Sequence, residues 1–378
     1  MLRVAVIASL FIVTVLACGN AVGQDKKVDP LDEPILGKTL GEWLKILRTH
    51  KNAKFRRAAL IALEGSNTAN KIGLPALLEC IEKDDEPQVR MEAVLVLGRQ
   101  GPETKGAIRA LVIAAHSDKS ERVREAAATA ISINKFIKQA EDYIPLLLDI
   151  LNKDPHAGTR VAVAGILRDM GAGAKPAFSS LLEAAKKANE DPLVRAAALH
   201  VVSRHDKDNP KVISLMIDFL KDAKTPPALR EASAEGLGRS ASSATDVIGI
   251  LETTLIDRKQ TIELRKTAAN SLLALKGNAR AAWPAVKKLV TDPSEDGGIR
   301  NSLIRLTGVF AFSNTEAIEA LTTAAASDLS TENRIAAIQE LGELPSLPAS
   351  TRKTLKDIAD EDARAAIREA AAKVLKKS

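Results

Sequence analysis

The chain has 378 residues, of which 46% are apolar but only 3% aromatic, and its formal net charge is +6. The excess charge is thinly spread, because residues 25–150, 151–260 and 261–378 carry net charges of only +1, +2 and +2. No part of the sequence has the dense basic composition of a nucleic-acid-binding surface, so no nucleic-acid partner is predicted.

Residues 1–23 differ in composition from the rest of the chain. Arg3 is followed by an apolar run, Val4 to Ala17, and then by small residues. This run is too short to span a bilayer, which takes about 20 residues, but it suits the apolar region of a secretory signal. We therefore expect residues 1–23 to be a signal peptide that is cleaved after Gly23, releasing a periplasmic or extracellular protein.

An alternative reading centres on Cys18. The segment Val15-Leu16-Ala17-Cys18 is similar to a bacterial lipobox, in which the cysteine becomes the lipidated N-terminus. In that case the signal is residues 1–17, and the lipid anchor is the chain's contact with the membrane.

Residues 24–38 are charged and contain two prolines, which favours a flexible linker. Folding is expected to begin at Thr39, because Thr39 and Glu42 have the spacing of a capping box. Apolar residues then recur with helical spacing at Leu40, Trp43, Leu44 and Leu47.

One arginine returns through the rest of the chain at intervals of 34 to 36 residues. A fixed period of this length indicates a solenoid, in which each repeat buries its apolar face against its neighbours. The sequence thus predicts a single all-α body of about ten two-helix repeats over residues 39–378. The arginines are Arg56, Arg90, Arg124, Arg160, Arg195, Arg230, Arg265, Arg300, Arg334 and Arg368.

Each repeat has two halves. A first apolar helix often begins near a proline, which is tolerated in a first helical turn. The arginine opens a second helix whose inward positions are alanines, and a glycine eight residues later is expected to end this helix in the left-handed conformation. Those glycines are Gly98, Gly238, Gly308 and Gly342.

An aspartate precedes most of the arginines, six or eight residues upstream. We expect each carboxylate to accept hydrogen bonds from helix N-terminal amides and from an arginine of its own or the next repeat, forming a structural ladder. The predicted ladder carboxylates are Asp84, Asp118, Asp154, Asp222, Asp257, Asp292, Asp328 and Asp360.

The pattern Asp-loop-Val-Arg-x-x-Ala-x-x-Ala-Leu-Gly resembles the HEAT repeat, in particular the short HEAT-like repeats of phycobilisome lyases. This resemblance covers residues 39–377. It implies a right-handed α-α superhelix with the second helices on the concave side. Members of this family include scaffolds, lyases, hydroxylases and regulators.

Signatures of catalysis are weak. The five histidines lack the His-Glu pairs by which HEAT-like hydroxylases hold iron, and neither a nucleophile motif nor a phosphate-binding glycine loop is present. We therefore predict no catalytic residue, no metal site and no cofactor. The resulting hypothesis is an exported, monomeric scaffold for protein or peptide partners, and the alternatives are a hydroxylase or lyase relative and a cytosolic regulatory protein.

A partner-binding face is expected one, five and nine residues after each arginine. These positions share a face of the second helix that is distinct from its alanine-rich face, and in the central repeats they are polar. The candidate partner-binding residues are His200, Arg204, Glu235, Arg239, Asn270 and Arg305.

Overall fold

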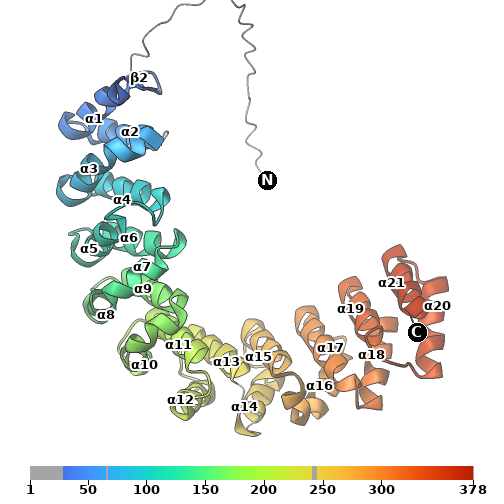
Figure 1. Cartoon of the computed structure of the whole chain (residues 1–378). Coiled ribbons are helices and arrows are strands. Elements are labelled where there is room, and N and C mark those ends of the chain that lie inside the picture. The colour runs from blue at the N-terminus through green and yellow to red at the C-terminus, as the bar shows by residue number, and fades with distance from the viewer. Residues whose placement is uncertain (1–28, 65–66, 241–244, 378) are drawn as a thin grey trace, which may run out of the picture.

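The computed structural model describes residues 29–64, 67–240 and 245–377. The predicted signal peptide and Cys18 lie outside these residues. Within the described residues the fold is an all-α solenoid of ten helix pairs that follow one another along an arc (Figure 1).

In each pair an outer helix is followed by an inner helix that faces the hollow of the arc (Figure 1). The first, outer helices are α1 (Leu40–Thr49), α3 (Asn67–Lys83), α5 (Ala107–Ser117), α8 (Ile144–Lys153), α10 (Phe178–Lys186), α12 (Pro210–Lys221), α14 (Thr245–Ile256), α16 (Trp283–Val290), α18 (Thr315–Ser327) and α20 (Ala349–Glu361). The second, inner helices are α2 (Ala53–Leu63), α4 (Pro87–Gln100), α6 (Glu121–Ile133), α9 (Ala157–Asp169), α11 (Pro192–His205), α13 (Pro227–Arg239), α15 (Ile262–Leu275), α17 (Gly297–Ala311), α19 (Thr331–Leu341) and α21 (Ala365–Lys377).

Short helical segments join some of the pairs. The four-residue helix α7 (Ile137–Ala140) and the 3-10 turn η2 (Glu141–Tyr143) precede α8. The 3-10 segments η3 (Gly171–Ala177) and η4 (Lys276–Ala282) precede α10 and α16.

The start of the folded body differs from the predicted flexible linker over residues 24–38. From Asp29 the chain forms the 3-10 turn η1 (Pro30–Asp32) and an antiparallel hairpin of β1 (Pro34–Ile35) and β2 (Lys38–Thr39). Ile35 is buried, and its carbonyl accepts a hydrogen bond of 2.7 Å from Trp43 Nε1. The prolines and charges of this segment do not indicate a hairpin, because the hairpin is stabilised by contact with α1 rather than by its local sequence. The capping box of Thr39 and Glu42 forms as predicted.

The core runs the length of the solenoid between the two layers of helices. The alanines of the second helices, among them Ala93, Ala127 and Ala268, are fully buried, as is the apolar residue before the arginine in most repeats. Each buried Leu, Ile or Val stabilises the fold by about 2 kcal/mol, while the alanines set how closely adjacent helices approach.

The glycines near the ends of the second helices have a different role from the one expected. Gly98, Gly238, Gly308 and Gly342 all have negative φ, so none is a left-handed helix terminator. Each instead lies against the next repeat: a Cβ at Gly98, for example, would be 3.0 Å from Ala130 Cβ. The absence of a side chain permits close approach of neighbouring inner helices.

Prolines mark the first turn of several helices, including α8, α12 and α16. Pro75 differs, because α3 begins at Asn67 and this proline lies inside the helix. Pro176 lies inside η3, before α10 begins.

None of the helices in the described part of the chain combines the length and the apolar character needed to cross a bilayer.

Candidate functional site

In most repeats an arginine of the second helix joins its repeat to the next one. Arg90 donates from Nε and Nη2 to the two carboxylate oxygens of Asp118 in the next repeat, at 2.7 and 2.8 Å. Its Nη1 donates to the carbonyl of Asp84, six residues upstream, at 2.7 Å. Asp84 in turn accepts two hydrogen bonds from the guanidinium of Arg56 in the preceding repeat. A continuous ladder results, and its polar groups are almost entirely shielded from water.

Seven junctions contain such an arginine–carboxylate rung among the described residues. The acceptor always lies 28 or 30 residues after its arginine, which is the spacing that brings it to the start of the next second helix. The pairs are Arg56–Asp84, Arg90–Asp118, Arg124–Asp154, Arg160–Glu190, Arg265–Glu295, Arg300–Asp328 and Arg334–Asp362.

Four predicted ladder carboxylates are not rungs. Asp222, Asp257 and Asp292 lie in the loops that are two residues longer, where each accepts a hydrogen bond from the backbone N–H two residues on. The extra residues place the rung acceptor three residues later. In the last repeat Asp362, and not Asp360, accepts the guanidinium of Arg334.

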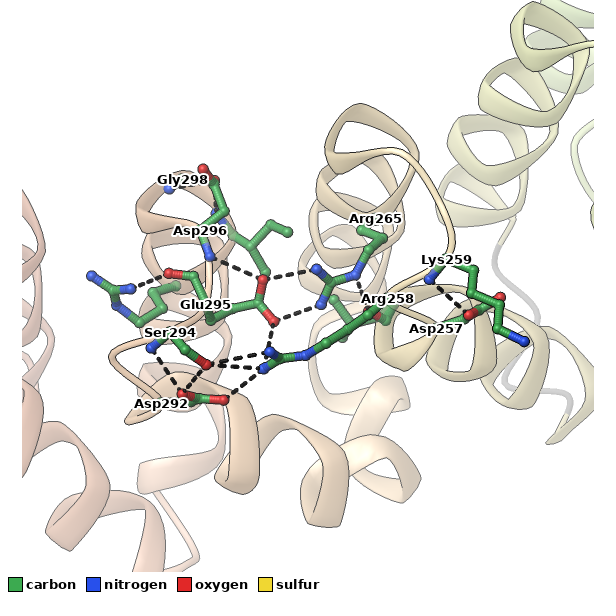
Figure 2. A network of polar contacts seen from close by, with 12 residues as sticks. Asp257, Arg258, Lys259, Arg265, Asp292, Ser294, Glu295, Asp296 and Gly298 are labelled. Atoms are coloured by element: carbon green, nitrogen blue, oxygen red, sulfur yellow. Dashed lines mark hydrogen bonds and ion pairs between the residues drawn. The ribbon is translucent and has the colours of Figure 1, made fainter.

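The junction of the seventh and eighth repeats shows this displacement (Figure 2). Arg265 binds both oxygens of Glu295, while Asp292 accepts a hydrogen bond of 2.7 Å from Arg258. The aspartate pattern of the sequence does not include glutamates such as Glu295 and Glu190. Their position 30 residues after Arg265 and Arg160 is the sequence signal that identifies them.

Among the described residues, two consecutive junctions in the middle of the array have no carboxylate rung. Arg230 donates to the amide oxygen of Gln260 at 2.7 Å. The position opposite Arg195 is occupied by Thr225, and Arg195 instead donates to the carbonyl of Ala185 at 3.0 Å and stacks 5.4 Å from the ring centroid of Phe219. Its counterpart at the end of the array, Arg368, donates to the carbonyl of Asp362.

The pKa values of the arginines follow this difference. The hydrogen bond that Arg90 donates to Asp118 raises the pKa of Arg90, and the one to Asp328 does the same for Arg300, in each case against the opposing effect of burial. Burial lowers the pKa of Arg195. These arginines stabilise the contact between repeats, and their guanidinium groups are already engaged in contacts within the protein.

A groove of about 420 Å³ is lined by the second helices of four consecutive repeats. These helices face the hollow of the arc (Figure 1). Its surface is made mostly of small residues, with a few polar side chains and one exposed leucine. The lining residues are Val161, Ala164, Gly165 and Arg168 of α9, Leu193, Ala196, Ala197 and His200 of α11, Ala228, Glu231, Ala232 and Glu235 of α13, and Thr267 of α15.

Two of the six candidate partner-binding residues line this groove. His200 Nδ1 lies 3.4 Å from Glu235 Oε2 across the α11–α13 junction, and Glu235 also pairs with Arg239 one turn along its own helix. Burial lowers the pKa of His200, with further lowering by Arg239 and Arg168 and a partial offset by Glu235. A neutral imidazole is therefore expected near pH 7.

The other four candidates lie outside the groove. Arg239 pairs with Glu235 beside it. Arg204 is exposed, at the end of α11. Asn270 accepts a hydrogen bond of 2.6 Å from Ser302, and Arg305 donates to Asn301 at 3.3 Å on its own helix. Other groove residues lie on the face that the repeat predicts, although they are not among the six candidates. Among them, Glu231 lies one residue after Arg230, and Val161 and Gly165 lie one and five residues after Arg160.

In the described ranges, no group of three or more His, Cys, Asp or Glu side chains is arranged to hold a metal ion. Cys80 is buried in α3, and burial together with Asp84 raises the pKa of its thiol to about 12.

Comparisons with known proteins agree with this architecture. The family model described as HEAT repeats matches residues 40–132 and 144–238. No curated protein sequence is significantly similar to the chain.

Solved structures share the fold at low sequence identity. Importin beta is 15% identical with a TM-score of 0.63, over 89% of this chain and 54% of its own. Kap121p bound to Pho4p is 14% identical with a TM-score of 0.50, over 89% of this chain and 40% of its own. YibA of E. coli is 19% identical with a TM-score of 0.50, over 78% of this chain and 99% of its own. This chain thus spans about half the length of the importin beta chain and less than half the length of the Kap121p chain.

The repeat length, the paired helices with their arginine ladder, the family match and the shared fold together show that the chain belongs to the HEAT-repeat proteins.

Proposed function

We propose that the protein is an interaction scaffold whose concave groove holds a segment of a partner protein. The observation that carries this proposal is the groove itself, which crosses α9, α11, α13 and α15. Its floor of alanines and Gly165 has no side chain large enough to keep a partner's main chain away.

An extended segment suits the length of the groove. Adjacent helices pack at about 9–10 Å, so four of them span about 30 Å. An extended chain advances about 3.3 Å per residue, so about nine residues would cross the four repeats. Kap121p, which has a similar architecture, has a structure bound to another protein, Pho4p, and this supports a protein partner.

Gly165 allows a direct test. A Cβ at Gly165 would meet nothing within 4 Å, so a larger side chain there fills the groove without disturbing the helix packing. Gly249 of the outer helix α14 is equally open and is the matched control.

The experiment selects random dodecapeptides displayed on phage against the full-length chain and measures their affinity by fluorescence anisotropy. We expect Gly165→Leu to weaken the selected peptides at least tenfold and Gly249→Leu to leave their affinity unchanged. Equal binding to both variants, or no selected peptide, would overturn the groove as the binding site.

We further propose that the scaffold acts outside the cytoplasm, on the basis of the apolar segment in residues 1–23. Cell fractionation and the mass of the mature N-terminus test this. An N-terminus at Gln24 supports the soluble exported form, a lipid-modified Cys18 supports the anchored form, and an intact Met1 in the cytosolic fraction would contradict both.

A further inference from the structure

Several charged side chains on the inner face of the solenoid form ion pairs across neighbouring repeats. Arg57 contacts Glu92 at 3.1 Å, and Arg99 contacts Glu64 at 2.5 Å. Arg168, which lines the groove, instead donates to the adjacent Asp169 on its own helix at 2.9 Å. Each of these contacts offsets the charge of both side chains with an opposite charge close by.

Glu231 departs from this pattern. It lines the groove on α13, yet among the described residues no cation lies within ion-pairing distance of it. Its neighbour Glu235 lies one turn further along the same helix and also lines the groove, and carboxylates spaced in this way repel one another.

The nearest lysine on the next helix does not compensate. Lys266 occupies the position on α15 that corresponds to Glu231 on α13, but its side chain extends toward α17. Its Nζ lies 3.6 Å from the place that a Cβ on Gly298 would occupy. The groove therefore presents an uncompensated negative charge in a chain whose net charge is +6.

Many of the residues that line the groove with Glu231 are small and apolar. Ala196, Ala197, Ala228 and Ala232 form the nearby floor, and Leu193 is 60% exposed at the groove. A ligand here would meet the carboxylate of Glu231, which has no ion pair within the described part of the chain, together with small apolar side chains and the larger apolar side chain of Leu193.

We propose that the partner segment carries a lysine or arginine whose charge pairs with Glu231, flanked by small or apolar residues that lie over the alanine floor and against Leu193. This inference rests on the proposed function, because it specifies the chemistry of the segment that the groove holds. Arginine suits the site as well as lysine, since either side chain is long enough to reach a carboxylate from a main chain on the floor.

The test uses the peptides selected on phage. We expect them to be richer in lysine and arginine than the starting library. For one such peptide, affinity is measured by fluorescence anisotropy against the wild-type chain, Glu231→Gln and Glu319→Gln, the last being an exposed glutamate on the outer helix α18. A lysine-to-glutamine version of the peptide completes a double-mutant cycle.

Glu231→Gln should weaken binding about fivefold, the size expected for a partly exposed ion pair. Glu319→Gln should have no effect, and Glu231→Gln should no longer weaken binding of the lysine-to-glutamine peptide. Circular dichroism and thermal unfolding of each variant verify that it is folded.

The outcomes separate the two proposals. If Gly165→Leu abolishes binding but Glu231→Gln leaves it unchanged, the groove stands and the cationic segment is overturned. Selected peptides enriched in aspartate or glutamate would also overturn it. If Gly165→Leu itself has no effect, the groove as the functional site fails.

Discussion

Gly238 lies against Ser271 of the next repeat so closely that a Cβ on Gly238 would be 2.6 Å from Ser271 Cβ and 2.7 Å from its Cα. Two inner helices, α13 and α15, approach each other here because neither presents a large side chain. The missing side chain of Gly238 therefore allows two repeats to pack closely, whereas the missing side chain of Gly165 on α9 leaves the groove open.

These two glycines predict opposite effects of the same substitution. Gly238→Ala should lower the free energy of unfolding by about 1–2 kcal/mol, because the overpacking cost exceeds the gain in helix propensity. Gly165→Ala should raise it by up to about 1 kcal/mol, since the methyl group enters open space. Thermal and urea unfolding measure both, and shifts in the same direction would contradict the assignment of the two sites.

The ladder predicts a graded response to loss of its arginines. Arg90→Ala strands the buried carboxylate of Asp118 and should cost about 3 kcal/mol. Arg230→Ala leaves only the neutral amide of Gln260 and should cost about 1 kcal/mol. Urea unfolding of the two variants provides the comparison, and equal losses would show that the charge of the acceptor is unimportant.

A carboxylate introduced at the neutral junction should stabilise the protein. Thr225 is the residue opposite Arg195, and burial of that arginine without a carboxylate lowers its pKa. Thr225→Asp should raise the free energy of unfolding by about 1 kcal/mol through a new charge-assisted hydrogen bond. Thr225→Asn is the uncharged control, and a melting temperature no higher than that of the control would argue against the predicted geometry.

Acid should destabilise the ladder. Burial opposes ionisation of Asp328, but hydrogen bonds from Arg300 and from the Ser330 N–H outweigh it and hold the pKa of Asp328 below its usual value. Glu190 is shifted in the same direction, through the N–H of Asp191 and Arg160. Because these pKa values are lower in the folded state, the unfolded chain binds more protons in acid.

The stability from these carboxylates should therefore be fully present above about pH 5 and decline as the pH falls below about 4, where carboxyl groups of the unfolded chain protonate. Urea midpoints at pH 7, 5 and 3 test this. Asp328→Asn should show a smaller loss between pH 5 and pH 3 than the wild type, because one of the responsible carboxyls is absent. An equal loss would exclude Asp328 as a contributor.

Much of the architecture could be predicted from sequence because its causes are local. The 34- to 36-residue spacing of the arginines, the buried alanines after them and the Thr39 capping box each depend on residues within one repeat or on simple periodicity. The narrower resemblance to phycobilisome-lyase repeats stays a prediction.

Details that depend on contacts between repeats could not be predicted in this way. The choice of Glu295 over Asp292 as the partner of Arg265 follows from a loop two residues longer, whose path is set by packing. Gly238 and Gly165 are the same residue type on equivalent helices, yet one faces Ser271 and the other faces open space. The groove likewise arises from the relative placement of four helices. This placement depends on the distance between neighbouring repeats, which the periodicity of the sequence does not specify.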